Sequence, residues 1–211
     1  MNHKIDLNAL HGPRSYGADT YRTYDLQFAT GPFLGPGVAE MERQAQLFLN
    51  DLAHRRGEAV PRWLTFSGCP GCGKTHLARR IRDIAREQLG FTERSAQMWT
   101  VSRVAEMLRG GDWGVLDHLA GVPLLVLDDL GAEYRSELLT SKLYDLFNRR
   151  LWMWTVLTTN LTAQEIADRL DARLTSRLRR GFNELVYARD ARDYCWMRPA
   201  DRNPFANNTR R

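Results

Sequence analysis

The most restrictive feature of this sequence is the segment 68–75, GCPGCGKT, which fits the pattern G-x-x-x-x-G-K-[ST] at every fixed position. A short run of β-forming residues (63–66) precedes it, and apolar residues with helical spacing follow over residues 75–89. Glycines in such a turn let backbone N–H groups point at phosphate oxygens, and the following helix adds the positive end of its dipole. The sequence therefore predicts a phosphate-binding loop between a strand and a helix.

Two residues of this loop have predicted chemical roles. Only 3 of the 30 cationic residues are lysines, and Lys74 is one of them. Its ammonium is a compact, hydrated point charge, which suits the β- and γ-phosphates of a nucleotide. Thr75 is predicted to offer its hydroxyl to Mg²⁺. The loop thus predicts a nucleotide bound together with Mg²⁺.

A second polar site follows the apolar run 124–127, which ends in Asp128 and Asp129. Asp128 is predicted to hold Mg²⁺, directly or through its water, and Asp129 to orient or deprotonate an attacking water. Glu133 is a weaker candidate for the base, because it lies beyond the turn. Because Asp128 and Asp129 are expected to lie beside the phosphate loop, we favour these roles over a turn with two solvated carboxylates.

Strand-like and helical segments alternate along the chain. Besides 63–66, the expected strands are residues 97–101, 124–127, 155–158 and 184–187. Apolar spacing predicts helices near 41–52, 75–89 and 139–147, and Thr162 with Glu165 forms a capping box before another. This order predicts an α/β fold with a parallel five-stranded sheet, helices on both faces and ligands at the carboxyl ends of the strands. Asn160, just after a strand, is then placed to contact the γ-phosphate and the attacking water.

Arginines dominate the C-terminal part of the chain. From Arg169 onward there are 11 arginines and 5 acidic residues. Arg173 and Arg177, four apart on an expected helix, share one face and could present a guanidinium to the γ-phosphate of a neighbouring subunit. As alternatives, these arginines could simply form a solvated basic surface, or they could bind the phosphates and stacked bases of a nucleic acid.

Two pairs of residues allow a structural interpretation. Cys69 and Cys72 form a C-x-x-C, but a zinc site needs two further ligands and only His76 is near, so no zinc is expected. The two cysteines either fill a tight loop or form, on oxidation, a disulfide that stops nucleotide binding. Trp152 and Trp154, at the start of an expected strand, are predicted to pack in the core or an interface.

Composition narrows the class of protein. No apolar run approaches the roughly 18 to 20 residues that span a bilayer, so no membrane association is expected. The N-terminus does not resemble a secretion signal, and 3 cysteines cannot form a disulfide framework, so we expect a cytoplasmic protein with reduced thiols. The expected organisation is an extended arm (1–37), one ATPase core (38–198) and a flexible basic tail (199–211).

These motifs together resemble the AAA+ ATPases, specifically the DnaC-like and IstB-like branch. GCPGCGKTHLA looks like its Walker A, LLVLDDLGAE like its Walker B, TVLTTNL like its sensor 1 strand and DRLDARLTSRL like its arginine-finger helix. The resemblance covers about residues 24–198. It implies an AAA+ core with no full C-terminal lid domain, and no separate N-terminal domain is expected before residue 24.

The resemblance implies a role for each motif residue. Asn160 becomes sensor 1 and Arg177 an arginine finger acting in trans within a homo-oligomer, with Arg173 a secondary interface residue. The implied catalytic residues are Lys74, Asp129, Asn160 and Arg177, and the implied Mg²⁺ ligands are Thr75 and Asp128. The implied ATP-binding residues are Gly68, Cys69, Pro70, Gly71, Cys72, Gly73, Lys74, Thr75 and His76.

Such proteins bind single-stranded DNA and open or deliver a replicative ring helicase of the DnaB type. The expected function is therefore an Mg²⁺-dependent ATPase that loads a helicase during DNA replication. One alternative is an IstB-like transposition helper ATPase that binds duplex target DNA. An alternative of another class is a binding module that uses ATP without hydrolysing it and occupies or inhibits a helicase.

Overall fold

The computed structural model describes residues 35–53, 60–132, 137–188 and 190–193. The expected tail, and all of the expected arm before residue 35, lie outside these ranges, as does Glu133. In chain order the elements are α1 (Pro36–Ala53), β1 (Trp63–Gly68), α2 (Lys74–Gln88), β2 (Ala96–Thr100), α3 (Val101–Arg109), α4 (Gly114–Gly121), β3 (Leu124–Leu130), α5 (Glu137–Arg149), β4 (Trp154–Thr159), α6 (Ala163–Arg169), α7 (Ala172–Leu178) and β5 (Glu184–Ala188).

The strands form one parallel sheet in the order β2-β3-β4-β1-β5. All five expected strands are confirmed. The predicted helix around Met41 begins earlier, at Pro36, inside the segment that was expected to be extended. Proline fits the first turn of a helix, because the N–H that it lacks has no partner there. Since the strands are parallel and β3, β4 and β1 are neighbours, the loops after these three strands share one edge of the sheet.

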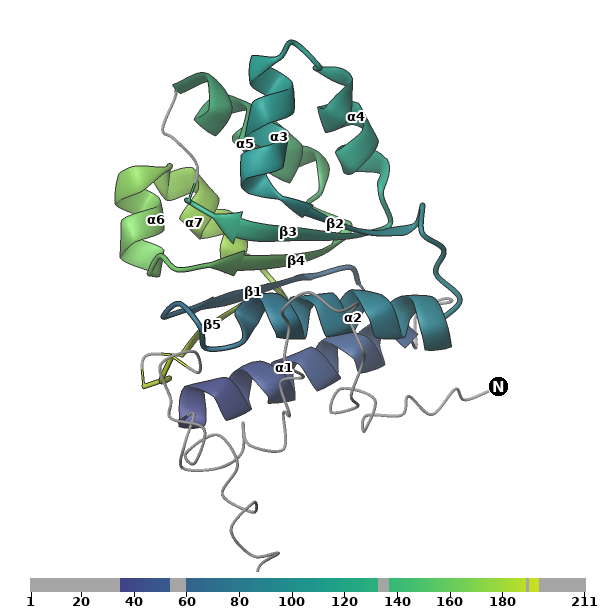
Figure 1. Cartoon of the computed structure of the whole chain (residues 1–211), viewed down its shortest axis with the longest axis vertical. Helices are drawn as coiled ribbons and strands as arrows, with labels where there is room; N and C mark the ends of the chain where they lie inside the picture. The colour runs from purple at the N-terminus through teal and green to yellow at the C-terminus, as the bar shows by residue number, and fades with distance from the viewer. Residues whose placement is uncertain (1–34, 54–59, 133–136, 189, 194–211) are drawn as a thin grey trace, which may run out of the picture.

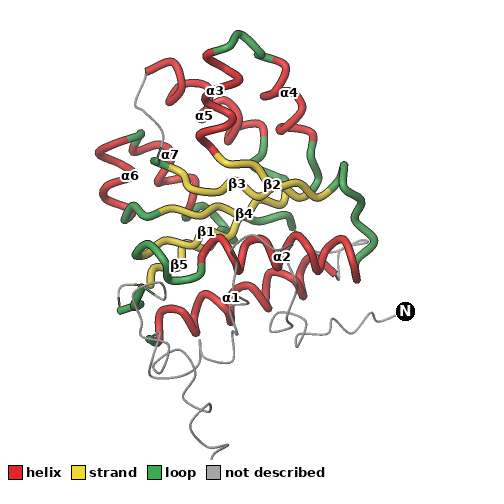
Figure 2. Tube along the Cα trace, in the orientation of Figure 1, coloured by secondary structure: helices red, strands yellow, loops and turns green. Residues whose placement is uncertain are grey.

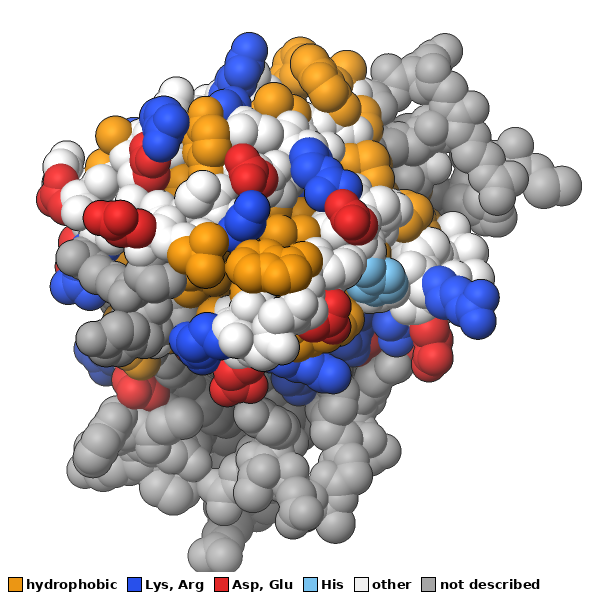
Figure 3. Space-filling model, turned by 90° about the horizontal axis from the view of Figure 1, so that it is seen from above, with side chains coloured by type: hydrophobic (Ala, Val, Ile, Leu, Met, Phe, Trp, Pro, Cys, Tyr) orange, Lys and Arg blue, Asp and Glu red, His pale blue; other side chains and the backbone are white. Residues whose placement is uncertain are grey.

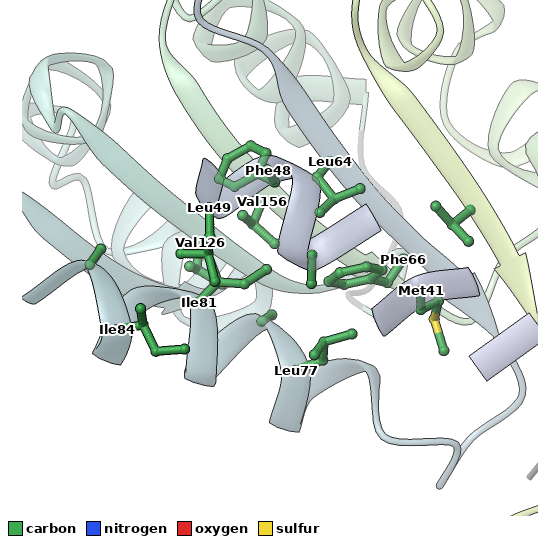
Figure 4. Close-up of a cluster of buried hydrophobic side chains, with 14 of the residues drawn as sticks. Met41, Phe48, Leu49, Leu64, Phe66, Leu77, Ile81, Ile84, Val126 and Val156 are labelled. Atoms are coloured by element: carbon green, nitrogen blue, oxygen red, sulfur yellow. The ribbon is translucent and has the colours of Figure 1, made fainter. Parts of the chain in front are cut away.

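Helices cover both faces of the sheet, as predicted. Figures 1 and 2 show α1 and α2 on one face and α3, α4 and α5 on the other. Successive strand residues alternate between the two cores: Leu64 and Phe66 pack with α1 and α2, whereas Trp63 packs with the opposite helices. Figure 4 shows the first of these cores. Strands buried on both faces need apolar residues at nearly every position, which explains the continuous apolar runs in the sequence.

One fully buried arginine joins the second core to the sheet. The guanidinium of Arg150 donates hydrogen bonds to the carbonyls of Leu119 (2.7 Å), Val122 (2.8 Å) and Trp154 (2.7 Å). Its Nε donates to Thr155 Oγ1 at 3.0 Å. Burial lowers the pKa of Arg150 to about 9, so the side chain stays protonated at neutral pH. Arg150 thus ties the C-terminal end of α4 to the start of β4.

The surface is mixed in character. Seen from the side of α3, α4 and α5, hydrophobic side chains lie among charged groups of both signs (Figure 3). Within the described ranges, no helix is both long enough and apolar enough to cross a membrane. Trp154 is buried, as predicted for the core, whereas Trp152 is 72% exposed and does not pack in the core of this chain. The other half of the prediction, that Trp152 packs in an interface, stays a prediction. Trp152 lies in the turn before β4, where it points away from both cores.

Candidate nucleotide-binding site

The predicted strand–loop–helix arrangement is confirmed. β1 ends at Gly68, and α2 begins at Lys74. Between them Gly71 (φ 73°) and Gly73 (φ 94°) adopt left-handed backbone conformations, which would be strained in a residue with a side chain. A Cβ on Gly68 would lie 3.0 Å from the carbonyl oxygen of Ala188 in the neighbouring strand. Glycine is therefore required in this loop both for the turn and for close packing against β5.

The Lys74 side chain folds back over the loop. Its Nζ donates hydrogen bonds to the carbonyl oxygens of Gly68 (2.9 Å) and Cys69 (2.7 Å), and the side chain is buried. These carbonyls are neutral, and phosphate oxygens are stronger partners for an ammonium. Lys74 is thus held at the loop by contacts that a bound phosphate group can replace.

Three side chains from three elements meet at Asp128. Its Oδ1 accepts hydrogen bonds from Thr75 Oγ1 (2.9 Å) and from Thr158 Oγ1 (2.6 Å). Thr158 Oγ1 also accepts the backbone N–H of Asp129 at 2.9 Å. Sequence analysis missed Thr158, although a hydroxyl residue near the end of a buried strand was a signal. The hydroxyl of Thr75 and the carboxylate of Asp128 are hard oxygen donors, so this pair fits Mg²⁺.

Asp129 and Asn160 also come together, as predicted. Asn160 Nδ2 donates to Asp129 Oδ1 at 3.3 Å. The backbone of Asp129 has φ 64°, and the pairing of β3 with β4 shifts register between Leu127 and Leu130. Burial and the charge of Asp128 raise the pKa of Asp129, against the opposing effect of Lys74. A strained, partly buried carboxylate beside a phosphate loop is typical of a catalytic position.

Residues 190–193, which we call the post-β5 segment, lie against the phosphate loop. The thiol of Cys69 donates to the carbonyl of Ala191 at 3.0 Å, and a Cβ on Gly71 would overlap the carboxylate of Asp193. Asp190 Oδ1 accepts the backbone N–H of Gly37 at the start of α1 (3.1 Å). No sequence pattern had indicated this packing. The segment places a negative charge next to the loop that is predicted to hold phosphates.

Both cysteines of the loop are free thiols. Cys72 is buried, and burial raises the pKa of its thiol to about 11. Burial, together with the charges of Arg80 and Arg79, lowers the pKa of His76 to about 4, so its ring is neutral at pH 7. In the part of the chain that the structure describes, no cluster of three or more His, Cys, Asp or Glu residues is placed to hold a metal ion.

Arg177 lies on α7 and contacts α5 rather than the phosphate loop. Its Nη2 donates to the Tyr144 hydroxyl at 2.8 Å, and its guanidinium carbon lies 4.9 Å from the centre of the Tyr144 ring. Arg173 shares that ring at 4.4 Å and also pairs with Asp171 at 2.7 Å. Together with Arg179 and Arg180, these residues line a surface pocket of about 690 Å³. We call this group the arginine surface.

Comparison with known proteins supports the fold. No family model matches the sequence, and no curated protein does so either. A crystal structure of the DnaC helicase loader is similar, with a TM-score of 0.60 and 25% identity over 74% of this chain and 92% of that chain. A DnaI structure has a TM-score of 0.54 and 23% identity, covering 72% of this chain and 85% of that one.

A structure of AMPPCP-bound DnaA from Aquifex aeolicus has a TM-score of 0.56 and 21% identity. The match covers 72% of this chain but only 47% of that one, so this chain spans about half of the DnaA structure. The likeness is in the fold, a five-stranded parallel sheet with helices. By fold, this chain is similar to the DnaC-like AAA+ P-loop proteins.

Proposed function

We propose that this protein is an AAA+ ATPase that couples ATP hydrolysis to loading or remodelling a replicative ring helicase on single-stranded DNA. The observation that carries the ATPase part is the convergence of Thr75 and Thr158 on Asp128, next to Lys74 at the loop. The similar structures include a DnaC helicase loader and a DnaA bound to AMPPCP and single-stranded DNA, which supports a role in replication.

Hydrolysis requires the chain to bind the phosphates, offset their negative charge and orient the attacking water. The phosphates bind to backbone N–H groups of the loop 68–75, of which Pro70 has none, and Lys74 exchanges its carbonyl partners for β- and γ-phosphate oxygens. Thr75 and Asp128 would hold Mg²⁺, which offsets phosphate charge when bound. Asp129 and Asn160 position a water that attacks the γ-phosphorus. The bond to the β–γ bridging oxygen breaks, ADP leaves, and the raised pKa of Asp129 suits it to accept the proton.

Arg177 supplies charge to the same reaction from a second copy of the chain. Within the described residues, it makes no hydrogen bond to the phosphate loop or to Asp128, Asp129 or Asn160, and it pairs with no carboxylate. A guanidinium on the surface of one subunit can reach the γ-phosphate of its neighbour, where it offsets charge in the transition state. The active form in this proposal is therefore a homo-oligomer.

The test is ATP turnover by the purified protein alone, with single-stranded DNA and with duplex of matched length. Lys74→Ala is the control that identifies contaminating ATPase. We expect stimulation by single strands, followed by co-purification with a ring helicase. Stimulation by duplex alone would indicate a transposition helper instead. No turnover under any condition, with ATP still bound, would indicate a binding module that does not hydrolyse ATP.

A further inference from the structure

Two of the four arginines of the arginine surface, Arg173 and Arg177, differ in their electrostatic environment. Arg173 donates from Nε and Nη2 to the carboxylate of Asp171 at 2.7–3.1 Å, so its charge is compensated within the chain. Arg177 has no carboxylate partner in the described part of the chain, and its Nε is buried without a hydrogen bond. The side chain of Arg177 therefore retains a net charge and unused hydrogen-bonding capacity.

Hydrogen bonds nevertheless fix both the backbone and the side chain of Arg177. Its carbonyl accepts Nδ2 of Asn183 at 2.8 Å, and Asn183 Oδ1 accepts the backbone N–H of Trp63 at 2.7 Å. The backbone of Arg177 is thereby fixed to β1, the strand that leads into the phosphate loop. Among the described residues, the guanidinium at the other end is held by Tyr144 alone, through one hydrogen bond and the face of the ring.

We infer that Tyr144 is the positioning residue for Arg177, holding its guanidinium toward a phosphate group bound by a second copy of the chain. This inference rests on the proposed action of Arg177 in trans. A long arginine side chain on a surface loses rotamer freedom when it binds an anion, and a preorganised donor avoids that cost at the moment of reaction. The phenol oxygen accepts from Arg177, which fits the lowered pKa of Tyr144.

Two substitutions test the hydroxyl and the aromatic ring of Tyr144 separately. Tyr144→Phe retains the ring but loses the acceptor, and we expect kcat of the assembled protein to fall about fivefold to tenfold, with KM for ATP unchanged within about twofold. Tyr144→Ala also removes the cation–π contact, and we expect kcat to fall about 100-fold. Asp145→Asn, on the exposed side of the same helix, is the matched control and should keep wild-type turnover.

Mixed assemblies distinguish positioning from a general loss of structure. Lys74→Ala subunits have a defective nucleotide site but an intact Tyr144 and Arg177. Mixing them with Tyr144→Ala subunits pairs the intact nucleotide site of one with the intact arginine of the other. We expect turnover to reappear in the mixture, although each variant alone is inactive or nearly so. A Tyr144→Ala chain that had merely lost structure would have no working nucleotide site, and mixing would restore nothing.

Two results would overturn the inference in distinguishable ways. If Arg177→Ala abolishes turnover while Tyr144→Phe and Tyr144→Ala stay within about twofold of wild type, the action in trans stands and Tyr144 is not its positioning residue. If Arg177→Ala itself leaves turnover of the assembled protein unchanged, the action in trans fails, and the role of Tyr144 fails with it.

Discussion

The phosphate-loop edge and the arginine surface are both polar sites on one fold, but they differ in how complete they are. At the loop edge, Thr75, Asp128 and Thr158 are bonded to one another, and Lys74 has carbonyl partners. At the arginine surface, Arg177 has a phenol for a partner and no carboxylate among the described residues. The first site is assembled by one chain, whereas the second has, in our proposal, an anion from a second copy as its partner.

Arg150 shows that a missing carboxylate does not by itself mark a functional arginine. Like Arg177, it has no carboxylate partner among the described residues, but all three of its guanidinium nitrogens donate to oxygens of this chain. Its side chain is fully buried, whereas Arg177 lies at a surface pocket. The informative difference is therefore between Arg150, all of whose guanidinium nitrogens donate to this chain, and Arg177, whose Nη2 donates to Tyr144 while its Nε has no hydrogen bond.

The largest effect is expected from Arg177→Ala. Without the guanidinium, turnover of the assembled protein should fall about 10³-fold, because nothing else offsets the charge on the transferring phosphoryl group from that side. ATP affinity should change less than about twofold, since the loop is intact. Arg173→Ala is the matched control, and its loss should stay below about tenfold because Asp171 already compensates Arg173. Equal losses in the two variants would contradict the distinction.

A second prediction concerns stability. Arg150→Met should lower the free energy of unfolding by about 3 kcal/mol, because buried carbonyls lose their donor. Urea denaturation with an unchanged m-value measures this difference. The neighbouring Arg149→Met removes only an exposed ion pair with Asp117 and should cost less than about 1 kcal/mol. Similar losses in both variants would mean that the carbonyls around Arg150 find other donors.

Thr158 tests whether the loop edge is a connected site. Thr158→Val removes the hydroxyl that donates to Asp128, so the carboxylate loses its orientation. The Mg²⁺ concentration that gives half-maximal turnover should rise about 10-fold to 100-fold. Thr158→Ser keeps the hydroxyl and should remain close to wild type in the same titration. An unchanged Mg²⁺ requirement for the valine variant would show that Asp128 is oriented without Thr158.

The smallest effect is expected at the post-β5 segment. Asp193→Asn should increase ATP affinity about fivefold, because Asp193 lies against Gly71 of the phosphate loop. Removing one unit charge about 4 Å from a phosphate in water is equivalent to about 1 kcal/mol. Isothermal titration at low and high salt measures the effect, which should shrink as salt screens the charge. Asp190→Asn, whose carboxylate bonds to Gly37 instead, is the control. If the asparagine at 193 weakens binding, the segment assists the nucleotide instead of opposing it.

Much of the site was predictable because its signals are local. The loop 68–75 carries its chemistry in consecutive residues between a strand and a helix, and Asp128, Asp129 and Asn160 each follow an apolar run. A parallel sheet places the ends of its strands at one edge, so these positions come together without knowledge of the packing. The strands were found for a similar reason: β3 is a continuous apolar run up to Asp128, and the others are short runs rich in β-branched, aromatic and other apolar residues.

The remaining features depend on contacts between distant residues. Thr158 is 30 positions from Asp128, Tyr144 is 33 from Arg177, and Ala191 is 122 from Cys69. Hydrophobic periodicity gives the face of a helix or strand but not which polar atoms meet across it. For the same reason periodicity did not show that Trp152 lies outside the core while Trp154 lies inside it, since the geometry of a turn decides which side chains enter the core.

The sequence alone determined the fold class, the phosphate loop and the acidic residues beside it, because short-range backbone conformation and apolar runs specify each of them. Only the tertiary structure decided which hydroxyl orients Asp128, which of the two arginines is compensated and what lies against the loop. Thr158 meets Asp128 where β4 pairs with β3, and Arg177 meets Tyr144 where α7 meets α5. Asp193 lies against the loop where the chain runs after β5, and all three contacts follow from packing across the domain.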